Sequence, residues 1–212
     1  MQRSMTVTYE VGDNLYVNLT NRCPCACVFC IRTHDDGAYG SDPLWLEHEP
    51  TFAEIRASFE ARDMSRYREI VFCGYGEPLM RFALVCEVAR WLREQYPGKP
   101  IRLNTNGLCE LYAPQEALAD GTGAAEKLAG CIDKVSVSLN AGDAACYDRV
   151  TCPSGHPTNA YETMLRFAAG CKARGIATAF TVVDVLTPEE TAQAVRQGES
   201  MGIPVHVRAY ID

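Results

Sequence analysis

The sequence predicts an α/β protein in which parallel strands alternate with helices. Three observations carry this prediction: short apolar runs, two helix-start signatures, and a helical spacing of apolar residues between the runs. The runs recur over most of the 212 residues and leave room for a helix between successive strands. The six predicted strands are residues 15–19, 69–73, 101–105, 134–139, 177–183 and 205–210.

Two threonines mark the starts of predicted helices. Thr51 and Thr187 each stand three residues before a glutamate, Glu54 and Glu190, and this arrangement satisfies free backbone amides at a helix N-terminus. Apolar residues then return at intervals of three and four, which gives each predicted helix one apolar face. These faces contain Phe52, Ile55 and Phe59, then Phe82, Val85, Cys86 and Ala89, and later Tyr161, Met164, Leu165 and Ala168.

Six strand-helix units fit two architectures, an open doubly wound sheet and a partial (β/α)6 TIM-like barrel of six parallel strands. Periodicity alone does not choose between them. No internal repeat, low-complexity stretch or linker divides the chain, so we expect a single domain over residues 1–212. In both architectures, ligands bind at the loops that follow the carboxyl ends of the strands. The loop at residues 20–34, after the first predicted strand, is therefore the first candidate for a site.

Charge and hydropathy disfavour several classes of protein. The net charge is −7 and there is no run of lysines or arginines, which disfavours broad nucleic-acid binding. No apolar run of about 18 residues and no signal-like start is found, so we expect a cytoplasmic protein without a membrane span. The 11 cysteines are therefore expected to be thiols and not a disulfide framework.

Four of the cysteines stand close together in CPCACVFC, within the loop after the first predicted strand. Cys23, Cys27 and Cys30 have the spacing C-x3-C-x2-C, and thiolates at such short spacings hold iron–sulfur clusters. Three ligands on a four-iron cluster leave one iron open. The alternative is a structural zinc site with His34 as fourth ligand, although zinc sites usually have two ligand pairs. Cys25 is expected to point away from a cluster and to be inert.

The second predicted strand ends in VFCGYGEPLM. Gly74 and Gly76 would allow the backbone to approach a ligand closely, and Glu77 offers a carboxylate to an amine. Pro78 is expected to begin the next helix. Taken alone, this pattern could be only a tight strand-to-helix turn.

Together, CPCACVFC and GYGEP resemble the motifs of the radical S-adenosylmethionine (SAM) superfamily. In that family, C-x3-C-x-aromatic-C binds a [4Fe-4S] cluster and a GGEP-type motif holds the methionine amine of SAM. The resemblance implies that Cys23, Cys27 and Cys30 ligate the cluster and that Phe29 packs near the adenine. Tyr75 departs from the family pattern, because it replaces the second glycine of GGEP. The residues expected at the methionine part are Gly74, Tyr75, Gly76 and Glu77.

The resemblance continues, with weaker motifs, along the later strands. LNTNG and SVSLNA look like the third and fourth strands of the family, whose polar ends usually meet the ribose and carboxylate of SAM. The Asn-Gly pair could instead form only a turn. Arg208, in the last predicted strand, could pair with a carboxylate of SAM or of the substrate, or form a surface ion pair. The candidates at the two strand ends are Thr105, Asn106, Ser138 and Asn140.

The resemblance implies a radical SAM enzyme. Such an enzyme binds a [4Fe-4S] cluster and SAM, and reductively cleaves SAM to methionine and a 5′-deoxyadenosyl radical that abstracts hydrogen from a substrate. The substrate is not identified by the sequence. An electron donor such as flavodoxin or ferredoxin is an implied partner. One cluster is favoured over two, because the other cysteines have no C-x2-C pairing: Cys109, Cys131, Cys146, Cys152 and Cys171.

Within the superfamily, the chain is most similar to the TatD-associated radical SAM proteins. The similarity rests on NLTNRCPCACVFCIR, VFCGYGEPL and the intervening LWLEHEPT. It implies an association with a TatD-type hydrolase but no particular reaction. Alternatives are a purine-type rearrangement like that of 7-carboxy-7-deazaguanine synthase, a glycyl-radical activating enzyme, and a non-enzymatic zinc or electron-transfer protein. Residues 34–50 could form the mouth of the site or a solvated connection.

Overall fold

Six parallel strands form most of the main sheet in the computed structural model, which describes residues 2–113 and 123–210. All six were predicted from the sequence, and their ends differ from the prediction by at most two residues. They are β3 (Asn14–Val17), β5 (Glu69–Phe72), β6 (Ile101–Thr105), β7 (Lys134–Ser138), β8 (Ala177–Val183) and β9 (Val205–Arg208).

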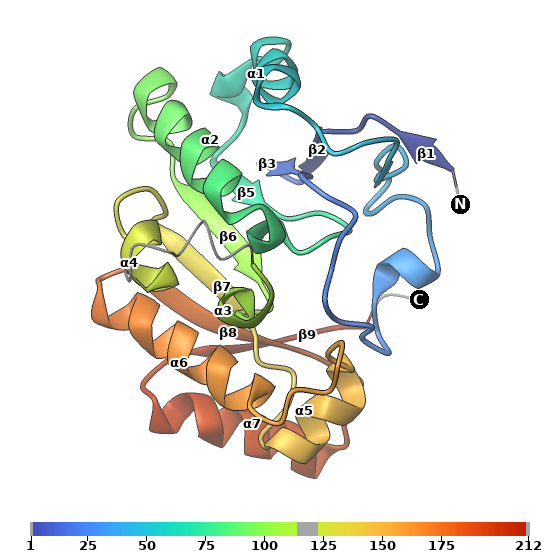
Figure 1. Cartoon of the computed structure of the whole chain (residues 1–212), viewed down its shortest axis with the longest axis vertical. Helices are drawn as coiled ribbons and strands as arrows, with labels where there is room; N and C mark the ends of the chain where they lie inside the picture. The colour runs from blue at the N-terminus through green and yellow to red at the C-terminus, as the bar shows by residue number, and fades with distance from the viewer. Residues whose placement is uncertain (1, 114–122, 211–212) are drawn as a thin grey trace.

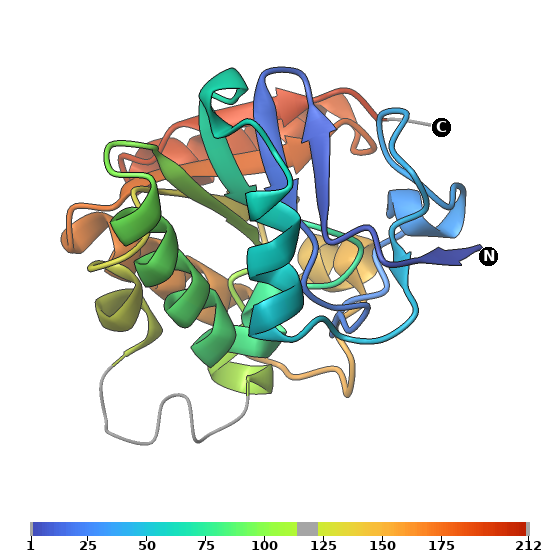
Figure 2. The ribbon, with the colours of Figure 1, turned by 90° about the horizontal axis from the view of Figure 1, so that it is seen from above.

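The order of the strands selects the barrel. They follow one another across the sheet in chain order, β2-β3-β5-β6-β7-β8-β9. A doubly wound sheet reverses its strand order at a switch point, and this order does not reverse. The helices follow along the outer side of the sheet (Figure 1), and the sheet is strongly curved when it is seen from above (Figure 2). The fold is therefore the partial TIM-like barrel.

Three short strands were not predicted. Strand β2 (Thr8–Val11) pairs antiparallel with β3 at the edge of the sheet, through a two-residue turn that begins at Gly12, where φ is +56°. Glycine favours this turn because it adopts positive φ without strain. Strands β1 (Arg3–Ser4) and β4 (Trp45–Leu46) form a separate parallel pair. Runs of two residues are too short to show a periodicity in the sequence, and β2 has no helix between it and the next strand.

The helices begin where the sequence signatures predict. Thr51 and Thr187 form capping boxes with Glu54 and Glu190. Pro78 starts the short 3-10 helix η3 (Pro78–Arg81), which precedes the predicted α-helix instead of beginning it. No helix among the described residues is long and apolar enough to cross a membrane. The α-helices are α1 (Phe52–Glu60), α2 (Phe82–Gln95), α3 (Cys109–Tyr112), α4 (Ala124–Leu128), α5 (Ala144–Thr151), α6 (Ala160–Ala173) and α7 (Pro188–Ser200).

The two faces of the sheet differ in polarity. The outer face is buried against the helices and is apolar, as Leu103 in β6 and Val137 in β7 show. The register places alternate residues on the inner face, where Asn104 pairs with Ser136. The predicted apolar faces of α1, α2 and α6 pack into the outer core. A TIM barrel is usually filled by apolar layers, so this polar inner face leaves room for a ligand.

A charged network closes the amino-terminal end of the barrel. Glu69 accepts from Arg102 Nε and from Lys134 Nζ, each at 2.8 Å. Arg102 also donates to Asn104 Oδ1 at 3.2 Å and to the Tyr16 hydroxyl at 3.4 Å. The ligand space therefore opens toward the carboxyl ends of the strands.

Candidate functional site

A cavity of about 190 Å³ lies at the carboxyl ends of the strands. The strand ends and the loop of residues 20–34 contribute to its wall, because parallel strands all end at the same edge of the sheet. Every residue that the sequence predicts for cluster or SAM binding lines this one cavity. These residues are Cys23, Cys27, Phe29, Cys30, Gly74, Tyr75, Gly76, Glu77, Thr105, Asn106, Ser138, Asn140 and Arg208.

Backbone hydrogen bonds hold the cysteine loop, residues 23–30, against the segment that ends α5. The partners, residues 150–154, lie far away in the sequence, which gave no sign of this pairing. The loop therefore has a fixed backbone at the cavity wall. The bonds run from Ala26 N to Cys152 O (3.2 Å), from Val28 N to Val150 O (3.0 Å) and from Ser154 N to Pro24 O (2.7 Å).

The expected orientation of Cys25 is wrong. Its side chain is buried at the cavity wall, its thiol is hydrogen-bonded to the thiols of Cys23 and Cys27, and Asn106 Nδ2 donates to its Sγ at 3.7 Å. A β-bridge to Pro153 turns this side chain inward. The hydrogen bond with Cys25 lowers the pKa of Cys23. The pKa of Cys25 is raised, mainly by its hydrogen bonds with Cys23 and Cys27 and then by burial. The neighbouring thiols and burial therefore favour the protonated form of Cys25.

Gly74 and Gly76 are required by packing within the chain itself. A Cβ at Gly76 would lie 2.2 Å from Thr20 O and 2.6 Å from Arg22 O. A Cβ at Gly74 would lie 2.2 Å from Asn18 Oδ1. The GYGEP segment thus lies directly against residues 18–22, which lead into the cysteine loop. This contact accounts for both glycines without a ligand.

Tyr75, which departs from the GGEP pattern, secures the segment of residues 35–45. Its hydroxyl lies 2.8 Å from Asp35 O and 2.7 Å from Gly37 O, and it donates to these carbonyls. Its ring packs edge-on against Trp45 with 5.3 Å between centroids. The side chain is therefore fixed to this segment, and Tyr75 also lines the cavity.

Glu77 connects the GYGEP segment to the end of β6. Its carboxylate accepts from Leu79 N at 3.0 Å, from Thr105 Oγ1 at 2.7 Å and from Asn106 N at 2.8 Å. Burial raises the pKa of this carboxyl, and the three hydrogen bonds act in the opposite direction. A carboxylate has about four acceptor positions, so one remains for an amine. Contact of Glu77 with SAM stays a prediction.

The two candidate asparagines also have structural hydrogen bonds. Asn106 Oδ1 accepts from Leu108 N at 3.0 Å, and Gly107 has φ +75°, so the Asn-Gly turn is present. Asn140 adopts φ +51° and accepts from Val183 N at 3.2 Å, which links the ends of β7 and β8. Both residues line the cavity as well.

Arg208 and His34 lie in different places. Arg208 lines the cavity, and among the described residues it forms no ion pair. His34 lies in a separate hollow with Asp35 and Asp36, and its Nε2 is 3.2 Å from the Tyr210 hydroxyl. The structure therefore does not bring His34 together with the cysteines, as the zinc alternative requires.

Four residues of the cavity wall were not predicted from the sequence: Cys73, Asn104, Tyr147 and Thr151. The alternation of β6 could have indicated Asn104. Tyr147, from α5, is fully buried, and within the described part of the chain its hydroxyl has no hydrogen-bond partner. An unpaired buried polar group costs about 1–3 kcal/mol. The unpaired hydroxyl at this wall, beside cysteine thiols, fits a cavity built for a bound group.

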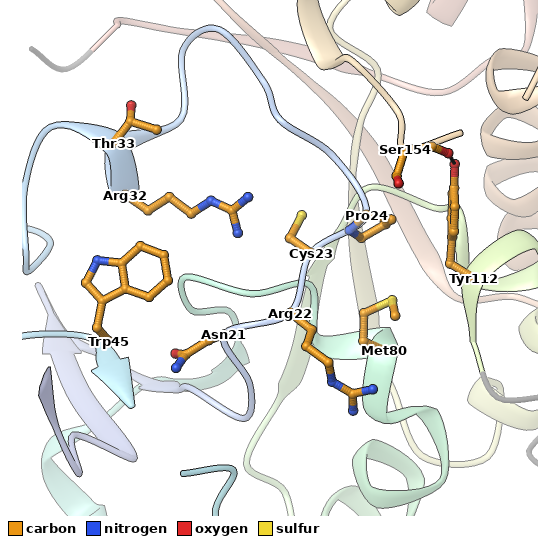
Figure 3. Close-up of a pocket in the computed structure, with 10 residues that line it drawn as sticks. All are labelled: Asn21, Arg22, Cys23, Pro24, Arg32, Thr33, Trp45, Met80, Tyr112 and Ser154. Carbon is orange, nitrogen blue, oxygen red and sulfur yellow. Dashed lines mark hydrogen bonds between the residues drawn. The ribbon is translucent and has the colours of Figure 1, made fainter. Parts of the chain in front are cut away.

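A hollow of about 790 Å³ lies on the outer side of the cysteine loop. Figure 3 shows Cys23 at its centre, with the Arg32 side chain extended toward it. Cys23 lines both this hollow and the cavity. Arg32 donates to Cys25 O at 3.0 Å and to Tyr75 O at 3.3 Å, so its guanidinium joins the cysteine loop to the GYGEP segment.

Arg32→Ala is expected to lower the free energy of unfolding by about 2 kcal/mol, because hydrogen bonds from a charged donor contribute about 1.5–3 kcal/mol. Arg32→Lys should restore little of the lost free energy of unfolding, since an ammonium does not reproduce the planar fork of a guanidinium. The measurement is urea unfolding of the full chain. The control is Arg196→Ala, at an exposed arginine without a hydrogen bond or ion pair to described residues. Equal midpoints for Arg32→Ala and Arg196→Ala would contradict this role.

The fold and the site together define a class of enzyme: a partial barrel with three cysteines and a polar cavity at the carboxyl ends of its strands. The chain belongs to the radical SAM superfamily, whose sequence model matches residues 17–202. Members of this superfamily are enzymes that use a [4Fe-4S] cluster and SAM. No curated protein matches the chain significantly.

Solved structures share the fold. Methylornithine synthase (PylB) is 16% identical with a TM-score of 0.60, and the match covers 93% of this chain and 53% of that one. SuiB of Streptococcus suis, bound to S-adenosylmethionine, is 15% identical with a TM-score of 0.63, covering 93% and 38%. The anSMEcpe structure with bound AdoMet is 14% identical with a TM-score of 0.61, covering 93% and 51%. The chain thus spans about half or less of these proteins.

Proposed function

We propose that Cys23, Cys27 and Cys30 bind the [4Fe-4S] cluster and that SAM binds in the adjoining cavity. The observation that carries this proposal is the convergence of all predicted cofactor residues on one cavity wall. When bound, the two groups supply one-electron cleavage of a carbon–sulfur bond of SAM, giving methionine and a 5′-deoxyadenosyl radical that takes one hydrogen atom from the substrate.

The residues of the chain position these groups. The thiolates of the three cysteines hold iron, and the Cys25 thiol is a hydrogen-bonding neighbour of Cys23 and Cys27. The network of Glu77, Thr105 and Asn106 fixes the edge of the cavity and leaves one carboxylate position for the methionine amine. The hydroxyl of Tyr147 offers a further donor at the wall.

The sequence motifs also support the assignment of this chain to the TatD-associated radical SAM proteins. We propose a reduced flavodoxin or ferredoxin as the electron donor, since Cys23 borders the outer hollow as well as the cavity. An association with a TatD-type hydrolase stays a prediction from the resemblance.

Anaerobic reconstitution with iron and sulfide tests the proposal. We expect a brown protein that, with dithionite and SAM, releases 5′-deoxyadenosine and methionine in equal amounts. The control omits dithionite and should release neither product. A colourless protein that retains zinc, or a fully loaded protein that binds SAM and never cleaves it, would contradict the proposal.

A further inference from the structure

A second cavity, which we call the inner chamber, lies next to the cofactor cavity inside the barrel. Its volume is about 280 Å³. The two cavities share wall residues, among them Phe29, Cys73, Asn104, Ser138 and Arg208. A molecule in the inner chamber would therefore lie directly beside the group held in the cofactor cavity.

The walls of the inner chamber are aromatic. Tyr9 and Tyr16 pack with 5.3 Å between ring centroids. Their hydroxyls are already engaged, because Tyr9 donates to Cys73 O at 3.2 Å and Tyr16 accepts from Arg102 at 3.4 Å. Ring surface is thus the main feature that these residues present, and it suits a planar apolar group. The aromatic lining residues are Tyr9, Tyr16, Phe29, Tyr39, Tyr75 and Tyr210.

The inner chamber is positively charged. Arg208 is the one charged side chain among the described residues that line it, and none of these residues carries a carboxylate. At the base of the barrel, Glu69 faces both Arg102 and Lys134. With Arg208, the inner face of β5 to β9 carries three cations and one carboxylate, an excess of two positive charges in a chain of net charge −7. This local excess favours an anionic ligand.

We propose that the inner chamber binds the substrate and that the substrate is a small aromatic carboxylate. Its carboxylate pairs with Arg208, and its ring lies against Tyr9 and Tyr16. A guanidinium binds a carboxylate through two parallel hydrogen bonds, which fixes the orientation of the ring. The chamber volume is close to the lower limit of about 300 Å³ for small-molecule sites, which fits a single-ring compound. The assignment as a substrate site rests on the proposed function.

Benzoate and its uncharged analogue benzamide test the charge at Arg208. Both are titrated against the full reconstituted chain by calorimetry. We expect benzoate to bind at least about 10-fold more tightly than benzamide, a difference of about 1.4 kcal/mol. Arg208→Gln should remove this preference and Arg208→Lys should keep part of it. Arg196→Gln, at an exposed arginine on α7, should keep all of it.

Equal affinities for benzoate and benzamide in the unaltered chain would overturn the inference, whatever the variants do. A benzoate preference that survives Arg208→Gln would also overturn it. So would competitive displacement of benzoate by SAM, because Arg208 would then serve the cofactor. Benzoate binding needs no cleavage of SAM, so a protein that binds benzoate at Arg208 and releases no 5′-deoxyadenosine contradicts the proposed function and leaves the binding site intact.

Discussion

Cys30→Ala is expected to abolish cluster binding and, with it, the cleavage of SAM. Cys30 lines the cavity together with Cys23 and Cys27, and each of three ligands is indispensable when the fourth iron is left open. Loss of residues that only support a metal ligand costs about 10- to 100-fold in affinity or activity, and loss of a ligand should exceed this range. Iron and sulfide per chain, with release of 5′-deoxyadenosine, are the quantities to measure.

Cys25→Ala is the matched control for this loss. It removes a buried thiol that neighbours Cys23 and Cys27 in the same loop, but it removes no predicted ligand. The variant should keep its iron and sulfide. If Cys25→Ala loses the cluster while Cys30→Ala retains it, Cys25 is a ligand and the chosen set of three is incorrect.

The strands were predictable because their two faces have different surroundings. In β7, Val135 and Val137 are buried against helices, while Ser136 and Ser138 face the interior of the barrel. Apolar and polar residues therefore alternate along the strand, and this alternation can be recognised in the sequence. The helix starts were predictable for a similar local reason, since a capping box spans only four residues. Strand β2 was missed although β3, β5 and β9 are equally short. It joins β3 directly through a two-residue turn, so it lies outside the alternation of strands and helices from which the others were predicted.

The site was predictable to the extent that parallel strands end together. Thr105 and Ser138 are far apart in the sequence, yet both line the cavity because they end neighbouring strands. The orientation of Cys25 and the role of Tyr75 were not predictable, because they depend on Pro153 and on the carbonyl groups of residues 35 and 37. Such contacts between distant loops leave no periodic pattern in the sequence.

Gly76→Ala is expected to destabilise the fold strongly, because the new Cβ would lie within 2.6 Å of two backbone oxygens, those of Thr20 and Arg22. These atoms cannot move aside easily, since Glu77 N donates to Arg22 O at 2.8 Å. Overpacking usually costs about 1–3 kcal/mol, and a clash with backbone should reach the upper end, about 3 kcal/mol. For a chain of this size, that loss corresponds to a melting temperature lower by about 6–12 °C.

Gly130→Ala is the control for this effect, since its Cβ would meet nothing within 4 Å and Gly130 does not adopt positive φ. It should be neutral or stabilising by up to about 1 kcal/mol, because alanine lowers the conformational entropy of the unfolded chain. The comparison separates the close approach at Gly76 from the general cost of adding a methyl group. Thermal unfolding of the cluster-free chain measures both variants, and similar melting temperatures would show that residues 20–22 yield to the added atom. A lower melting temperature in Gly76→Ala alone would mean that the GYGEP segment supports the cysteine loop before any cofactor binds.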